Sequence, residues 1–215
     1  MCCVLHIGNQ RTKPHANLVL GDNVQTQVDN AGDLGLGVTA DSHLKFDMHI
    51  NLIITRAHRL SNVIHKCFAS KDPPTLVHAF TAYVRLLLEY ASCVWSPYTV
   101  RLVNKVESVQ RRFTKHFVCC YGLTYSQRLT KLRTENLQLC RLYLDLIYVY
   151  KILFGMVETE VSTHFVLHKL DTGIRDHSLK IFAHHSRIDA RKHFSVIVLY
   201  SAGIVCLLHL LTSLH

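Results

Sequence analysis

The sequence contains no two directly adjacent acidic residues. Its ten aspartates and five glutamates form no Asp-Asp and no Asp-x-Asp. Template-directed polymerisation needs carboxylates that hold two metal ions about 4 Å apart, so these residues do not provide that chemistry. Gly-x-Ser-x-Gly and phosphate-binding glycine loops are missing as well. We therefore expect no catalytic residue, no cofactor and no small-molecule substrate in this chain.

A Cys-x-x-Cys motif is also missing. The chain has eight cysteines, of which Cys2-Cys3 and Cys119-Cys120 are adjacent pairs, and this pattern fits neither a disulfide scaffold nor a zinc ribbon. His116 precedes the second pair at a ligand-like spacing, but no second pair of ligands accompanies it in the sequence. We expect no metal site, and reduced cysteines that favour an intracellular protein of the nucleus or cytoplasm.

Acidic residues are scarce relative to basic ones. The 215 residues include 24 Lys and Arg against 15 Asp and Glu, a formal net charge of +9. A chain of this length can bury a core as one domain, and its basic balance favours an acidic partner such as nucleic acid or an anionic membrane surface. The 16 histidines are scattered without metal-ligand spacing. We expect them to add positive charge as the pH falls.

Two helical patterns joined at Trp95–Tyr98 form the centre of the chain. The first, about 73–94, is apolar on most sides and begins well, because Asp72 can cap its backbone N–H groups and Pro73 fits a first turn. The second, about 99–118, is sharply two-faced. Its apolar side consists of Leu102, Val103, Val106, Val109, Phe113 and Phe117. Its polar side consists of Arg101, Lys105, Arg111, Arg112 and Lys115, with Glu107 as the only acid.

The basic side of the second helix is the candidate binding surface. Residues 99–133 contain eight Lys or Arg and one Glu, and Lys131 and Arg133 extend the basic set beyond this helix. A solvated helix face explains the same charges, so both interpretations stay open at this stage. Aromatic residues lie between the basic positions, and rings of this kind can stack on bases. We expect Phe113 and Phe117 to be buried, and we leave the positions of Tyr121 and Tyr125 open.

The remaining patterns predict an α+β fold that is mostly α. Residues 1–40 have β character, with a strand at Cys3–Gly8 and a hairpin at 18–28. The strand begins abruptly, and its sequence is not that of a signal peptide. Helical patterns follow at 43–70, 123–132 and 135–154, the last apolar nearly all round and therefore expected in the core. We expect four regions: N-terminal strands at 1–40, a helical domain at 41–155, an irregular basic segment at 156–193 and an apolar tail at 194–215.

Several motifs resemble non-LTR, LINE-type (jockey-like) retrotransposon reverse transcriptases over roughly residues 2–195. The order and spacing of five pieces carry most of the resemblance: Val84-Arg85, Leu88-Glu89-Tyr90, Trp95-Ser96-Pro97, Val109 to Lys115, and Tyr125 to Leu129. Residues 174–180 and 189–195 resemble two later motifs of the family. They depart from them at Ile174 and Asp176, where threonine and glycine are usual, and by one missing phenylalanine after His193.

The resemblance implies the end of the catalytic palm, the helical thumb and part of the region beyond it. Cys3–Gly8 resembles the last palm strand. Leu34–Val38 resembles the hairpin that supports the primer end in the family, and Leu34, Gly35 and Gly37 are the residues that match it. In the family, the adjacent catalytic aspartates lie upstream of the region that this chain resembles. The resemblance therefore implies a truncated fragment of an RNA-directed DNA polymerase that is not an enzyme on its own.

The chain departs from the family after Ser195. From Phe194 to Leu211, 18 residues carry no formally charged side chain. That length is at the lower limit for crossing a bilayer. A shifted reading frame, a buried C-terminal helix and a membrane anchor are the competing explanations.

From the basic helices and the resemblance we expect sequence-independent binding of RNA, an RNA–DNA duplex or a single strand. The alternatives are a small membrane-associated protein anchored by 194–211 and a non-functional transposon remnant.

Overall fold

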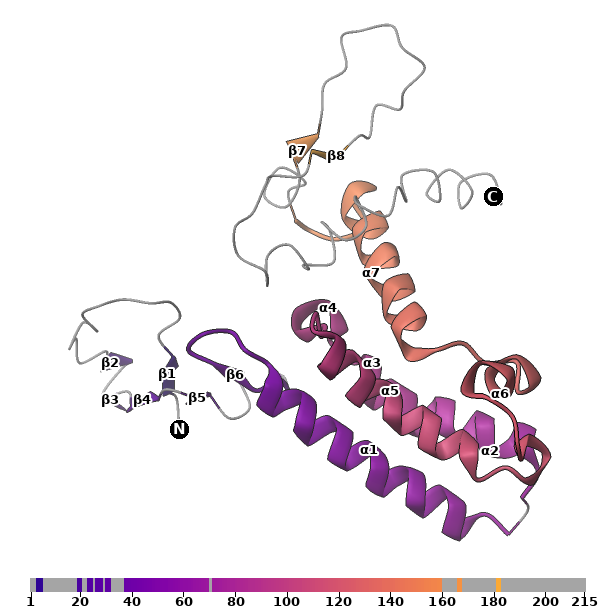
Figure 1. Ribbon diagram of the computed structural model, residues 1–215. Coiled ribbons are helices and arrows are strands. Elements are labelled where there is room, and N and C mark those ends of the chain that lie inside the picture. The colour runs from indigo at the N-terminus through magenta and orange to yellow at the C-terminus, as the bar shows by residue number, and fades with distance from the viewer. Residues whose placement is uncertain are drawn as a thin grey trace, which may run out of the picture. The chain divides into compact units, whose positions relative to one another are not determined.

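The computed structural model describes residues 37–69 and 71–159 with their side chains, together with the backbone of short strands elsewhere in the chain. The described residues are mostly helical (Figure 1). They belong to two compact units. The first comprises 1–91 and 99–134, and the second comprises 92–98 and 135–215. The helical region predicted for 41–155 therefore contributes to both units.

The N-terminal strands belong to the first unit and form three short two-stranded ladders. β1 (Cys3–Leu5) pairs in parallel with β4 (Thr26–Val28). β2 (Val19–Leu20) and β3 (Asn23–Val24) form an antiparallel hairpin with two residues between them. The hairpin predicted at 18–28 is thus confirmed only as far as Val24, because residues 26–28 pair with β1. β5 (Asn30–Ala31) pairs antiparallel with β6 (Ala40–Asp41).

Helix α1 (Asp47–Cys67) begins later than its apolar pattern predicts. The carboxylate of Asp41 accepts hydrogen bonds from the backbone N–H groups of His43 (3.1 Å) and Lys45 (2.5 Å). These bonds hold the chain in a turn in which Leu44 has φ of 53°. The buried side of α1 consists of His49, Ile50, Ile53, Ala57, Ser61 and Ile64. At the other end, Lys71 Nζ donates to the carbonyl of Phe68 at 2.9 Å.

The helix predicted at 73–94 is interrupted. It begins as expected, because the Asp72 carboxylate accepts from the Thr75 N–H at 3.2 Å and Pro73 occupies the first turn of α2 (Pro73–Ala79). A π-helical segment, η1 (Phe80–Arg85), and then α3 (Leu86–Glu89) follow α2 without a break. This continuous helical segment ends before Ala91, which has φ of 51°, and α4 (Ser92–Trp95) belongs to the second unit.

Three helices complete the first unit. They are α5 (Val100–Lys115), the 3₁₀ turn η2 (Val118–Cys120) and α6 (Tyr125–Lys131). Phe113 of α5 stacks on Phe80 of η1 at 4.5 Å between ring centroids, and it meets Phe117 edge-on at 5.5 Å. Phe113 and Phe117 are 2% and 3% exposed, which confirms that both are buried. The aromatic contacts fix α5 against the preceding helices.

The second unit is built on α7 (Leu137–Leu153), which packs against α4. Cys93 of α4 forms a hydrogen bond with Asp145 of α7, and burial together with this carboxylate raises the pKa of the Cys93 thiol to about 12. Burial raises the pKa of Asp145, while the Cys93 hydrogen bond and the charge of Arg141 lower it. β7 (Val166–Leu167) and β8 (Ile181–Phe182) form an antiparallel pair.

Helix α7 departs from the prediction of a helix buried nearly all round. Leu137, Leu146, Val149 and Ile152 are buried. Four large apolar side chains near the same helix are exposed instead: Tyr143, Ile147, Tyr148 and Phe154. The apolar tail predicted at 194–215 lies outside the described residues. None of the described helices is both long and apolar enough to cross a membrane.

Candidate nucleic-acid interface

The predicted basic cluster of α5 lies on one exposed side of that helix. Thr99 begins the helix, with its hydroxyl accepting the Leu102 N–H at 3.4 Å. At 100° per residue the five cations of the helix fall within an arc of about 120°. All five are exposed: Arg101, Lys105, Arg111, Arg112 and Lys115. The periodicity of α5 therefore sorts its apolar and basic side chains to opposite sides, as predicted.

Glu107 does not lie with these cations. The sequence pattern placed it on the polar side of α5, but its side chain is only 6% exposed. The Tyr125 hydroxyl, from α6, donates a hydrogen bond to its carboxylate. Burial and the neighbouring Glu107 raise the pKa of Tyr125. A tertiary contact thus removes the one acid of α5 from the exposed basic side.

Helix α1 runs beside α5 in the same direction (Figure 1). Arg101 Nη2 lies 3.2 Å from Asp47 Oδ1, and Lys105 Nζ donates to Asn51 Oδ1 at 3.1 Å. These contacts place the first turns of the two helices together. Helix α1 also carries three exposed cations that were not among the predicted site residues: Arg56, Arg59 and Lys66. The sequence shows that α1 has few acidic residues near these cations, but it does not show that α1 packs beside α5.

Helix α6 supplies the remaining predicted cations. A capping box between Thr124 and Gln127 begins it. Lys131 is exposed, and its ammonium group donates to the Cys119 carbonyl at 2.5 Å. Arg133, just beyond the helix, is exposed in a left-handed conformation with φ of 51°. Lys131 and Arg133 thus belong to the same compact unit as the cations of α5.

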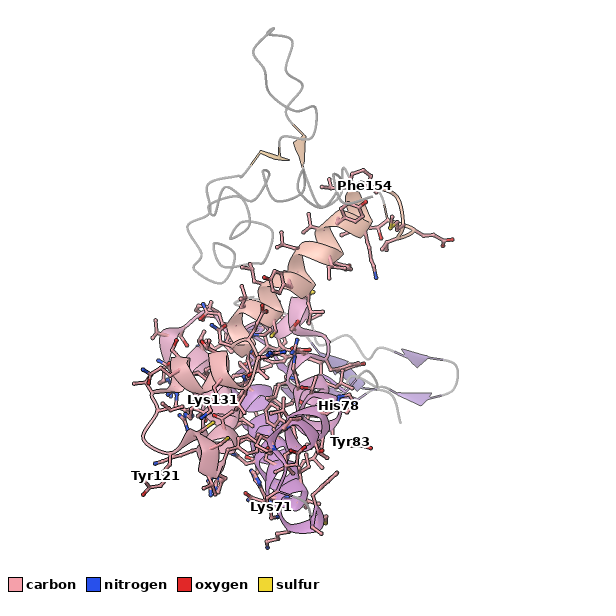
Figure 2. The ribbon with its side chains drawn as sticks, turned by 90° about the vertical axis from the view of Figure 1, so that its right-hand side faces the viewer. Lys71, His78, Tyr83, Tyr121, Lys131 and Phe154 are labelled. Atoms are coloured by element: carbon pink, nitrogen blue, oxygen red, sulfur yellow. The ribbon has the colours of Figure 1, made fainter. Side chains whose placement is uncertain are left out.

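The two tyrosines whose positions were left open differ sharply. Tyr121 is 91% exposed and projects away from the helices (Figure 2). Tyr125 is half-buried, with the guanidinium carbons of Arg111 and Arg128 at 5.1 and 5.6 Å from its ring centroid. Arg128 is buried and donates to the Arg111 carbonyl at 3.4 Å. Tyr125 is therefore part of the framework, whereas the ring of Tyr121 is open to solvent.

Histidines line the junction of α1 and α5. The His65 ring lies 4.4 Å from the Phe113 ring and 4.8 Å from the His116 ring, centroid to centroid. Burial lowers the pKa of His65, and His116 and Lys71 lower it further, against the opposing effect of a hydrogen bond with the Phe113 backbone. Burial and then Arg112 lower the pKa of His58 in the same way. These two histidines resist adding charge as the pH falls.

Every acid among the described residues of the first unit has a partner. Residues 37–69, 71–91 and 99–134 contain 14 Lys and Arg but only five Asp and Glu. The partners of the five are the turn at 43–45 for Asp41, Arg101 for Asp47, Thr75 for Asp72, Arg85 for Glu89 and Tyr125 for Glu107. The acids thus cap, pair and brace the fold, and the surplus positive charge is left on the surface.

The predicted primer-support residues are described only in part. Gly37 has φ of 73°, a conformation that favours glycine, and a Cβ at this position would lie 3.5 Å from the Tyr90 ring. It lies in the connection between β5 and β6. Leu34 and Gly35 lie outside the described residues. Within the described part of the chain, no three His, Cys, Asp or Glu side chains come together as metal ligands.

Comparisons with protein-family models, with curated proteins and with solved structures gave no match for this chain.

Proposed function

We propose that this chain is derived from a non-LTR retrotransposon reverse transcriptase and binds nucleic acid without catalysing polymerisation. Its first unit corresponds in this proposal to the thumb, preceded by strands from the end of the palm. The ligand is RNA paired with DNA, or a single strand, held through its phosphates. Contacts of this kind ignore base sequence and weaken steeply as the salt concentration rises.

The separation of acidic and basic side chains carries the proposal. Fourteen basic residues and five acidic ones share the described part of the first unit, and all five acids have partners inside the fold. Twelve of the fourteen basic side chains are exposed, whereas Arg85 is half-buried and Arg128 is buried. The surplus leaves cations that no acid among the described residues of this unit balances, and like charges repel one another unless an anion binds between them. The excess of cations favours a polyanion.

The positions of the resemblance motifs in the fold add support. Val84 and Leu88 are fully buried, and Arg85 Nε lies 2.5 Å from Glu89 Oε1. Gln110 is buried on α5, and Phe113 stacks on η1. Thus the motif residues build the framework of the helical unit, while Arg111, Arg112 and Lys115 of the same motif remain exposed. A motif that combines a framework with exposed cations suits a domain that presents a surface to phosphate.

A salt titration tests this function. We expect the purified chain to bind a labelled RNA–DNA duplex, and the double variant Arg111→Ala, Arg112→Ala to bind it more weakly. Loss of two phosphate contacts should lower the slope of log affinity against log salt by about 1.8. Titrations of the two proteins at several salt concentrations measure both quantities.

Two controls separate charge from fold. The variant Arg111→Lys, Arg112→Lys keeps both charges and should retain the salt slope. Lys151→Ala removes an exposed cation from α7 of the second unit and should leave the slope unchanged. An unaltered slope in the alanine double variant removes α5 from the interface. Failure of the unchanged protein to bind at low salt refutes the proposed function as a whole.

A further inference from the structure

Two adjacent thiols lie at the turn between α5 and α6. Cys119 Sγ and Cys120 Sγ are 3.6 Å apart, and both cysteines are free. Cys119 is exposed and Cys120 is buried. Neighbouring cysteines in an extended strand would point to opposite sides, whereas the 3₁₀ turn η2 brings their sulfur atoms together.

The turn that carries the thiols is held on both sides. The Cys120 N–H donates to the Phe117 carbonyl at 3.0 Å, and the Leu123 N–H donates to the Cys120 carbonyl at 3.3 Å. Lys131 Nζ fixes the Cys119 carbonyl from α6. Phe117, which precedes the turn, is anchored in the core against Phe113. The spacing of the two sulfur atoms is therefore set by the fold.

This spacing does not suit a direct disulfide. A disulfide needs its sulfur atoms about 2.05 Å apart and its Cα atoms about 4.4–6.8 Å apart. Neighbouring Cα atoms across a trans peptide are only about 3.8 Å apart, so a bridge between Cys119 and Cys120 would distort the turn. One soft atom bonded to both sulfur atoms spans more. With bonds of about 2.3 Å and a tetrahedral angle, the sulfur atoms would be about 3.8 Å apart.

We propose that Cys119 and Cys120 together bind a thiol-reactive ligand whose central atom bonds to two thiolates. A trivalent arsenical is the representative ligand of this class. Zinc in a structural site takes four protein ligands, and the described residues bring no third ligand here. Trivalent arsenic in an organic arsenoxide is complete with two sulfur ligands. The site is independent of the nucleic-acid function proposed above.

The reaction balances without an oxidant or a reductant. The exposed Cys119 thiolate attacks the arsenic of R–As=O first, and Cys120 follows as the second nucleophile. Two As–S bonds form, the arsenic–oxygen bond breaks, and the oxygen leaves as water with the two thiol protons. Arsenic keeps its oxidation state. The product is a nine-membered ring closed through the peptide bond between the two cysteines.

Phenylarsine oxide is the probe for this site. Cys2 and Cys3 are a second adjacent pair in the sequence, so the full chain is used with both replaced by serine. We expect intact-mass measurement of the reduced, folded protein to show one phenylarsenic adduct. Because chelation multiplies the effective thiol concentration, its removal should need roughly 100-fold more monothiol than removal from a single cysteine. A small dithiol should remove it readily.

Single substitutions assign the site. Cys119→Ser and Cys120→Ser should each abolish the monothiol-resistant adduct, whereas Cys67→Ser, at another exposed free cysteine, should keep it. Peptide mapping of the arsenic-bridged fragment gives the assignment without relying on the folding of the buried Cys120 variant. A resistant adduct that survives both substitutions, maps to other cysteines or fails to form on the folded chain overturns the proposal. Nucleic-acid binding enters none of these measurements.

Discussion

Arg101 and Asp47 pair at 3.2 Å between the first turns of α5 and α1, although 54 residues separate them in the chain. The same separation relates Lys105 to Asn51, one turn further along both helices, at 3.1 Å. Because the offset is constant, α1 and α5 run parallel with matched positions. His58 and Arg112 also differ by this offset, and burial and then the charge of Arg112 lower the pKa of His58. Asp47, Asn51 and His58 thus lie along the side of α1 that faces α5.

Removing the charge of Asp47 should strengthen nucleic-acid binding. Asp47 pairs with the predicted site cation Arg101, and this bridge is largely exposed. Exposed pairs of this kind contribute only about 0.2–1 kcal/mol to stability. We therefore expect Asp47→Asn to change the free energy of unfolding by about 0.5 kcal/mol or less. Its affinity for an RNA–DNA duplex at low salt should rise about two- to fivefold.

Glu158→Gln is the matched control, because it removes an exposed acid from the second unit. It should change the net charge equally and the affinity much less. Equal gains in the two variants would show that the total charge, and not the surface of α1 and α5, attracts the ligand.

The Tyr125 hydroxyl should be important for stability. It donates to Glu107, whose carboxylate is buried. Tyr125→Phe keeps the ring beneath Arg111 but takes one hydrogen-bond donor from that carboxylate. Loss of a partner from a buried polar group costs about 1–3 kcal/mol, so we expect a decrease of this size in the free energy of unfolding. Urea denaturation measures it.

Tyr121→Phe makes the same chemical change at a side chain that is 91% exposed. It should leave the unfolding midpoint unchanged. A similar midpoint for both tyrosine variants would mean that the Glu107 contact contributes nothing to stability.

Local periodicity correctly predicted the features that depend only on residues within one helix. The two-faced pattern of α5 placed Phe113 and Phe117 in the core, and Asp72 and Pro73 began α2 as expected. Those signals act over a few residues, so the sequence carries them directly. The predicted basic residues of α5 are exposed for the same reason.

Features that depend on distant contacts were missed. Glu107 is buried because a tyrosine 18 residues later reaches it. Asp47 and Asn51 of α1 meet Arg101 and Lys105 of α5 through packing between residues 54 positions apart. The left-handed Ala91 ended a helix whose apolar pattern continued to residue 94. In each case, tertiary structure overrode a local pattern that gave no sign of it.

Acid should destabilise the fold through the histidines between α1 and α5. The pKa of His65 is lowered from 6.5 by burial, His116 and Lys71, so the unfolded chain binds a proton more readily than the folded chain. The stability that neutral His65 contributes is present above about pH 6.5 and is lost as the pH falls toward its folded pKa. We expect the melting temperature to decrease between about pH 7 and pH 5.

His65→Phe should reduce this loss. The His65 ring lies 4.4 Å from the Phe113 ring, centroid to centroid, so phenylalanine keeps this packing and removes the titration. His78→Phe, at an exposed position on α2 (Figure 2), is the control and should retain the acid sensitivity of the unchanged chain. Equal pH profiles for His65→Phe and the unchanged chain would exclude His65 as a source of the effect.

Two substitutions of Arg133 should separate its backbone from its charge. Arg133 follows α6 with φ of 51°, and the Thr134 N–H closes the turn on the Leu129 carbonyl at 3.0 Å. A side chain in this left-handed conformation costs about 1–2 kcal/mol, which glycine avoids at the expense of greater freedom in the unfolded chain. We expect Arg133→Gly to be more stable than Arg133→Ala by about 0.5–1 kcal/mol in urea denaturation.

The same two variants test the place of Arg133 in the interface. Both lose one cation from the end of α6, so duplex affinity should fall equally in both while their stabilities differ. Equal affinity and unequal stability would show that the arginine contributes charge in a conformation that is unfavourable for it, which is expected of a residue kept for binding. If affinity instead follows stability between glycine and alanine, Arg133 acts by shaping the turn after α6. If neither variant loses affinity, Arg133 lies outside the interface.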